Sequence, residues 1–212
     1  MTALLIPVSS PQHAHAGRPS LRCPNCKQVG VFEKFENVAD LHSLKQPRHL
    51  FLQRRCPNVA CNTHVFVVLD ESEKVLRTYP SERADFDSGN IPPRIASTFN
   101  EAITCAAEGA YIAAAIMVRR TLEELCEDKS ASGSNLKERI LKLRSNVVLP
   151  AELFSAMDEL RLLGNDAAHI EAKVFDQIGK DEIELGMLLT KEILKAVYQL
   201  DDLVKKLQAL KK

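Results

Sequence analysis

Hydrophobic and polar residues alternate along the first third of the chain, from about residue 21 to 80. Short runs rich in Val, Leu and Phe occur at 29–32, 50–55, 65–69 and 75–79. Successive side chains of a strand point to opposite faces, and β-branched and aromatic residues favour strands, so each run predicts one strand. The polar stretch 70–73 (DESE) is typical of a turn between the last two. This region predicts a small antiparallel unit made of hairpins.

From residue 93 onward, apolar residues recur every three to four positions, which is the spacing of amphipathic helices. Helices are expected over about 95–106, 111–127, 136–143, 150–163 and 183–207. The last would be one helix of about 28 residues, or roughly 42 Å, since each residue adds about 1.5 Å. Because its neighbours are shorter, we expect its far end to pack on a second copy of the chain or on the N-terminal part.

The composition favours helix, because Ala and Leu are frequent, Trp is absent and aromatic residues make up only 5% of the chain. We therefore predict a mainly α protein, with a bundle of four to five helices preceded by a small β unit. The expected boundaries are a flexible tail over 1–20, the β unit over 21–80, a linker over 81–92 and the bundle over 93–212.

The formal net charge of +0 conceals an asymmetry. Between Arg18 and Arg55, eight Lys and Arg residues face three acidic ones, a local charge of +5, whereas residues 91–212 carry 17 basic and 19 acidic residues. A neutral chain has no global field that attracts nucleic acid or a membrane. Any attraction to phosphate is therefore expected in the N-terminal third.

The longest apolar run, 111–118, is far shorter than the roughly 20 residues that cross a bilayer. The sequence AHA at 14–16 imitates a signal-peptidase site, but Pro7 interrupts the short apolar segment before it and no basic residue precedes that segment. We expect a cytoplasmic protein with no membrane partner. In that compartment six cysteines favour metal binding over disulfides.

Four of the cysteines form two closely spaced pairs, CPNC at 23–26 and CPNVAC at 56–61. Zinc prefers four tetrahedral ligands, and thiolates suit it. Each pair adjoins an expected strand, as in a zinc ribbon. The predicted ligands of a structural zinc ion are Cys23, Cys26, Cys56 and Cys61. Four protein ligands leave no open position on the metal for catalysis.

Other interpretations of these residues stay open. The pairs could be redox or merely buried cysteines, although no βαβ pattern surrounds the C-x2-C motif. His64 could replace one cysteine as a ligand. Cys105 and Cys126 fall on apolar helix faces, which predicts packing in the core. The basic residues expected to offset the charge of four thiolates are Arg22, Lys27, Arg54 and Arg55.

Polar residues crowd together near the end of the fourth expected helix, over 160–169 (LRLLGNDAAH). Arg161, Asn165 and His169 recur at a spacing of four and therefore lie near one helix face. A polar stripe on a buried helix is costly unless its groups are satisfied or used. The alternative is structural: His169 caps the helix end and Arg161 forms intrahelical ion pairs.

Residues 162–169 (LLGNDAAH) and 115–123 (AIMVRRTLE) resemble a bacterial domain family of unknown function. Its members often carry an N-terminal zinc ribbon and occur attached to restriction-type endonuclease subunits. The family is related to the HEPN superfamily (higher eukaryotes and prokaryotes nucleotide-binding), which forms α-helical bundles. The resemblance covers roughly residues 20–205 and implies a HEPN-like bundle that is often dimeric.

Active members of that superfamily cleave RNA without a metal, at a site across the dimer interface. The resemblance implies a catalytic set of His169, Arg161, Asn165 and Asp166. Histidine would transfer the proton of a ribose 2′-hydroxyl, and arginine would stabilise the charge on the phosphate. Active members carry Arg immediately before the polar residue, where this chain has Gly164. Arg161 lies one turn earlier, and an arginine of the second helix could also supply the charge.

Three functional hypotheses follow. The first is a non-catalytic module that binds nucleic acid, a nucleotide or a protein partner, in a defence or restriction-type system, and forms a homodimer. The alternative is a metal-independent endoribonuclease with an Arg/His site at the dimer interface, to which the basic ribbon holds RNA. A scaffold for oligomerisation, the third hypothesis, rests only on the long last helix.

Overall fold

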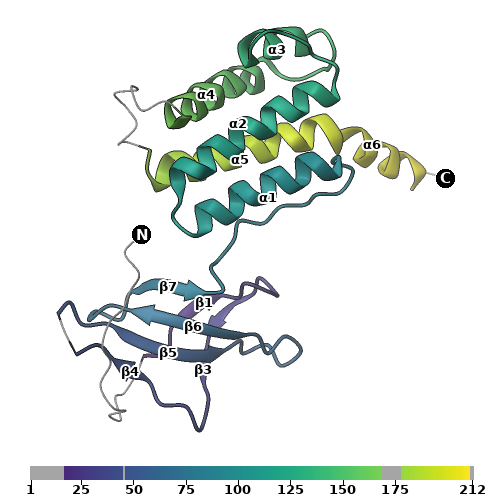
Figure 1. Ribbon diagram of the computed structural model, residues 1–212. Coiled ribbons are helices and arrows are strands. Elements are labelled where there is room, and N and C mark those ends of the chain that lie inside the picture. The colour runs from purple at the N-terminus through teal and green to yellow at the C-terminus, as the bar shows by residue number, and fades with distance from the viewer. Residues whose placement is uncertain (1–16, 45, 169–177, 211–212) are drawn as a thin grey trace. The chain divides into compact units, whose positions relative to one another are not determined.

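A computed structural model describes residues 17–44, 46–168 and 178–210. It divides into two compact units, residues 1–83 and 84–212, and each has its own hydrophobic core (Figure 1). The described residues form seven strands and six helices. The expectation of a mainly α protein with four to five helices was therefore wrong, because the strands make a separate folded unit. Most of the tail expected over 1–20 lies outside the described residues.

The first unit contains only strands: β1 (Ser20–Arg22), β2 (Val29–Val31), β3 (Glu33–Lys34), β4 (Leu41–His42), β5 (Leu50–Arg55), β6 (His64–Leu69) and β7 (Val75–Tyr79). Strands β1 and β2 pair with each other, and the other five form one sheet. In that sheet β5 pairs with β6 along its length, β3 and β4 pair with opposite ends of β5, and β7 pairs with β6. Every pairing is antiparallel, as predicted from the alternating pattern.

Strand β6 shows how the pattern places the core. Val65, Val67 and Leu69 are buried, whereas His64 before them and Phe66 between the two valines are exposed. The buried side chains join those of neighbouring strands and of the cysteine loops in one cluster: Leu21, Cys23, Phe32, Leu52, Cys56, Val65, Val67 and Leu69. One face of the sheet therefore supplies the core, and the other face is open to solvent.

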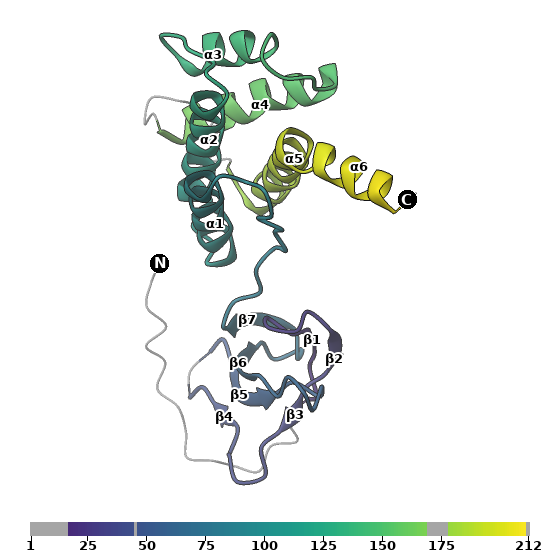
Figure 2. The same cartoon turned by 90° about the vertical axis from the view of Figure 1, so that its right-hand side faces the viewer.

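The second unit contains α1 (Pro93–Ala107), α2 (Tyr111–Asp128), α3 (Leu136–Leu143), α4 (Ala151–Ala168), α5 (Lys180–Tyr198) and α6 (Leu200–Ala209). Helix α2 packs against α1, α3, α4 and α5, and Figures 1 and 2 show it between α1 and α4. Small residues on its buried face, Ala114 and Ala115, permit close approach of its neighbours. The four helices expected before residue 170 all form.

The expected single last helix is instead two, and that prediction was wrong. Helix α5 ends at Tyr198 and α6 begins at Leu200, and Gln199 between them has φ −112° and ψ −27°. The side-chain amide of Gln199 donates to the carbonyl oxygens of Asp87 and Gly89, both at 2.9 Å. These hydrogen bonds hold the break against the segment before α1. Helix α6 then leads away from the other helices in both views, and none of its residues is buried (Figures 1 and 2).

Candidate functional site

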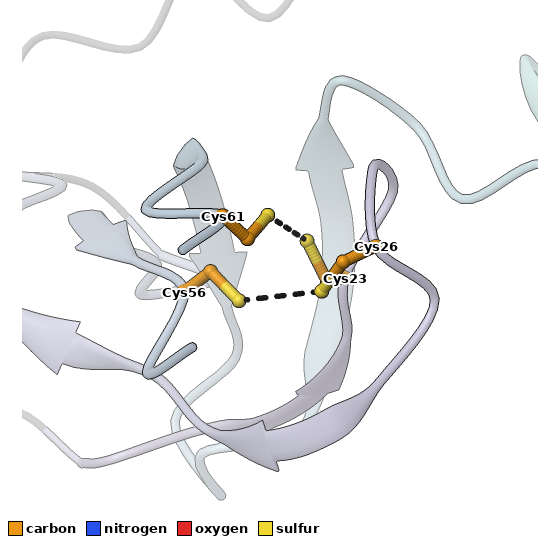
Figure 3. Close-up of side chains that lie close together, drawn as sticks. All are labelled: Cys23, Cys26, Cys56 and Cys61. Carbon is orange, nitrogen blue, oxygen red and sulfur yellow. Dashed lines mark hydrogen bonds between the residues drawn. The ribbon is translucent and has the colours of Figure 1, made fainter. Parts of the chain in front are cut away.

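The sulfur atoms of Cys23, Cys26, Cys56 and Cys61 converge in the first unit (Figure 3). The distance is 3.7 Å both from Cys23 Sγ to Cys61 Sγ and from Cys26 Sγ to Cys56 Sγ, and all four atoms lie within 4.8 Å of one another. All six cysteines are free thiols. A metal–sulfur bond of about 2.3 Å in a tetrahedral site gives sulfur–sulfur distances of about 3.8 Å. The cluster can therefore hold a metal ion, and the four predicted ligands are the residues that the fold brings together.

Two tight backbone turns present these sulfurs. In each, the residue that follows the second cysteine is left-handed, Lys27 with φ 64° and Asn62 with φ 48°. Lys27 N–H donates to the carbonyl of Cys23 at 3.1 Å, and Asn62 N–H donates to that of Asn58 at 2.8 Å. Because the turns are closed by backbone hydrogen bonds, the cysteine spacings themselves fix where the sulfurs point.

The four thiols have unequal surroundings. Burial raises the pKa of the Cys56 thiol to about 12. The Thr63 hydroxyl, 3.0 Å from Cys61 Sγ, lowers the pKa of the Cys61 thiol to about 6. A metal cation overrides such differences, because a coordinated thiol loses its proton outright.

Three of the four basic residues expected to offset the thiolate charge have carboxylate partners of their own. Arg54 is 1% exposed and forms a two-point contact with Asp40, with nitrogen–oxygen distances of 2.7 and 3.1 Å. Arg55 pairs with Glu33 at 3.0 Å, and Arg22 lies 3.7 Å from Glu82. Their charges are thus largely committed within the first unit.

The remaining cysteines and His64 lie outside the cluster. Cys126 is fully buried in the helical core, and burial raises the pKa of its thiol to about 12. Cys105 packs half-buried against the same core. Both agree with the predicted packing role. The imidazole of His64 stacks on Phe66 at a ring distance of 4.9 Å, so it belongs to the open face of the sheet.

Helix α4 carries the predicted polar stripe, and the structure describes part of it. Arg161 Nε donates to Asp158 Oδ1 at 3.0 Å, an ion pair within the helix. Asn165 is half-buried. His169 lies outside the described residues, and so does the side chain of Asp166. The two members of the proposed catalytic set whose side chains are described, Arg161 and Asn165, lie one turn apart on α4.

Helix α2 comes closest to the stripe at Gly164. A Cβ atom on Gly164 would collide with Arg119 Cβ and would lie 3.0 Å from the carbonyl oxygen of Ala115. Arg119 Nη1 donates to the carbonyl oxygen of Arg161 at 3.2 Å, and its Nε lies 3.1 Å from Glu123 Oε1. The side chain of Arg119 thus lies directly beside Gly164. Arg119 and Arg120 each form an ion pair one turn along α2, with Glu123 and Glu124 respectively.

Two features were missed from the sequence. The contact between Gly164 and Arg119 joins residues of two helices, and no pattern in the local sequence predicts it. A row of aromatic rings on the open sheet face, Phe35, His64 and Phe66, was also missed. The row could have been found from the strand alternation, because His64 and Phe66 occupy the outward positions of β6.

A four-cysteine β unit joined to an α-helical unit defines a two-part α+β protein with one candidate metal centre. The chain belongs to the family described as a domain of unknown function, DUF4145, whose sequence model matches residues 100–212. Neither a search of curated proteins nor a search of solved structures found a match. Across the described residues no helix is both long and apolar enough to cross a membrane.

Proposed function

We propose that this protein is a nucleic-acid-binding module that does not cleave its ligand and that binds through its N-terminal, zinc-containing unit. The observation that carries the proposal is the division of charge. Residues 1–83 contain 11 Lys and Arg against 7 Asp and Glu, whereas residues 84–212 contain 17 against 21. The first unit is therefore +4 and the second −4. Polyanions such as nucleic acids are drawn to the first and repelled by the second.

Zinc is the metal that suits the cluster best. Four cysteine ligands and no carboxylate favour a thiophilic ion over calcium or magnesium, and a tetrahedral four-sulfur set is typical of zinc or of iron–sulfur centres. The zinc would be structural, because four protein ligands leave no position for water or substrate. It would hold the turn at 23–26 against the turn at 56–61 and so shape the sheet beside them.

The helical unit is proposed to be a HEPN-like bundle without catalytic function. Catalysis in that superfamily uses an arginine at the position that Gly164 occupies here. The guanidinium of Arg161 is engaged by Asp158, and that of Arg119 by Glu123 and a backbone carbonyl. Because both guanidinium groups already have partners within the protein, they support a function without cleavage. A place in a defence or restriction-type system is the corresponding proposal for its biological context.

Fluorescence anisotropy with labelled RNA and DNA oligonucleotides tests this function. Binding is expected for the wild type, to persist in His169→Ala, and to be lost in Cys56→Ser, which removes one metal ligand. Cys105→Ser is the matched control, because that cysteine lies outside the cluster. Absence of binding in the wild type, or full binding by Cys56→Ser, would contradict the proposal.

A metal-independent endoribonuclease is the second candidate. One observation favours it: Arg119 places a guanidinium next to the α4 stripe, 3.2 Å from the Arg161 carbonyl. The test is cleavage of end-labelled RNA in the presence of EDTA. Cleavage by the wild type that is lost in both His169→Ala and Arg119→Ala would establish the enzyme and overturn the non-catalytic proposal.

A further inference from the structure

An aromatic row lies on the open face of the five-stranded sheet. The ring centroids of Phe35 and His64 are 4.6 Å apart, and those of His64 and Phe66 are 4.9 Å apart, the latter two stacked with planes 28° from parallel. Tyr79 on β7 stands in register with Phe66 on β6. The row therefore extends from the segment after β3 across β6 to the edge strand β7.

These rings are not needed for the core. Phe66 is 48% exposed and Tyr79 is 70% exposed, whereas Val65 and Val67 on either side of Phe66 are 1% exposed. The core of the first unit is formed by the other face of the sheet. Large aromatic side chains gathered on an open face mark a binding surface more often than a structural one. A ligand with planar groups can stack on these exposed rings.

Basic side chains lie among the rings. Arg55 is in register with His64, and Arg77 is in register with Val68, two residues along β6 from Phe66. Arg77 is exposed and has no ion-pair partner among the described residues. Glu33 pairs with Arg55, but the unit as a whole remains positive at +4. Cations beside exposed rings suit a ligand that combines planar groups with phosphates.

A surface pocket of about 290 Å³ adjoins the row at Phe35. Its lining consists of Lys34, Phe35, Glu36, Asn37, Val38 and Arg55. Small-molecule pockets are usually roughly 300–1,000 Å³ in volume, so this one is at the small end of that range. An aromatic wall, an amide and two basic side chains in such a space fit one nucleotide of a longer ligand.

We infer that the open sheet face binds single-stranded nucleic acid, whose bases stack on Phe66, Tyr79 and the Phe35–His64 pair while its phosphates lie against Arg77 and Arg55. This inference rests on the proposed function and names its ligand class and its residues. Single strands expose the faces of their bases, and aromatic side chains provide stacking surfaces that accept any base. A duplex hides those faces, so the aromatic row distinguishes the two forms.

The test uses the full-length, zinc-loaded protein and labelled oligouridine and oligothymidine of about 12 nucleotides, a length within the range bound by known single-strand-binding domains. Phe66→Ala is expected to weaken binding by about 5- to 150-fold, the range for loss of one base–aromatic stack. Leu76→Ala is the matched control, because Leu76 is equally exposed at 49% on the adjacent strand but has no register partner in the row. It should bind as the wild type does.

Phe66→Trp provides a second, positive readout. The chain has no tryptophan, so the new indole is the only one that fluoresces. It should retain affinity, and its emission should be quenched by the single strand and not by a duplex of the same length.

The outcomes separate the inference from the function on which it rests. Wild-type binding with no loss in Phe66→Ala, or with equal affinity for single strand and duplex, overturns the stacking surface and leaves a nucleic-acid-binding module. A wild type that binds neither form overturns both. Unchanged zinc content in each variant shows that a loss of affinity does not come from unfolding.

Discussion

Gly164 of α4 lies against Arg119 of α2 so closely that a Cβ atom has no space between them. The contact brings the α4 backbone within reach of the Arg119 guanidinium, which donates a hydrogen bond to the Arg161 carbonyl oxygen. Any side chain at position 164 would require the two helices to separate.

Gly164→Ala should therefore destabilise the helical unit. Overpacking of this kind costs about 1–3 kcal/mol, more than the roughly 1 kcal/mol that alanine gains over glycine within a helix. Gly186→Ala on α5 is the control, because its new Cβ would meet only the side-chain ends of Leu160 and Leu163, at 3.2 and 3.5 Å. Urea unfolding followed by circular dichroism measures both. Equal stability of the two variants would show that the α2–α4 contact is looser than described.

The buried ion pair of Arg54 and Asp40 should be a major determinant of stability in the first unit. Both side chains are 1% exposed, so removal of Asp40 leaves the buried Arg54 guanidinium with only backbone carbonyl acceptors, those of Gln53 at 2.8 Å and Gly17 at 3.4 Å. Asp40→Ala is expected to cost about 3–5 kcal/mol. The exposed pair Arg55–Glu33 offers the comparison, and Glu33→Ala should cost at most about 1 kcal/mol. Thermal unfolding of the two variants under the same conditions separates these values.

The stability of the helical unit should depend slightly on pH because of a carboxyl group at the start of α3. Hydrogen bonds from the backbone and hydroxyl of Ser134, both at 2.9 Å, lower the pKa of the exposed Glu138 carboxyl in the folded state. The contribution is therefore present above the unfolded-state pKa and is lost as the pH falls through the lower, folded-state value. In Glu138→Gln the urea midpoint should change less between neutral and acidic pH than in the wild type. Identical pH profiles would contradict this assignment.

The exposed apolar face of α6 should mediate the proposed homodimer. Leu200, Leu203, Val204 and Leu207 recur at helical spacing, and each is at least 47% exposed. Leu203→Glu is expected to give a monomer, whereas Lys205→Glu, on the same helix but outside this face, should not change the mass. Light scattering after size-exclusion chromatography measures it. A monomeric wild type would refute the dimer and would also remove the composite site that an endoribonuclease of this type requires.

The parts that could be predicted from the sequence are those encoded locally. Cysteine spacing determined the sulfur cluster, because each pair closes its own turn. Alternation at β6 and helical spacing in α1–α4 identified those elements, because burial on one face repeats along them. The break at Gln199 was missed because its amide bonds to a segment about 110 residues earlier. The fold class was wrong because a helix-favouring composition averaged over 212 residues gave the predicted β unit too little weight, and that unit forms seven strands around a core of its own.

The central claim is that the metal-built N-terminal unit binds nucleic acid. It is tested most directly by zinc content and single-strand affinity measured on one purified sample, before and after removal of the metal with a strong chelator. The account predicts one zinc ion per chain, loss of binding together with the metal, and a helical signal that persists because the second unit has its own core. Metal-free protein that binds as tightly as the loaded form would contradict it.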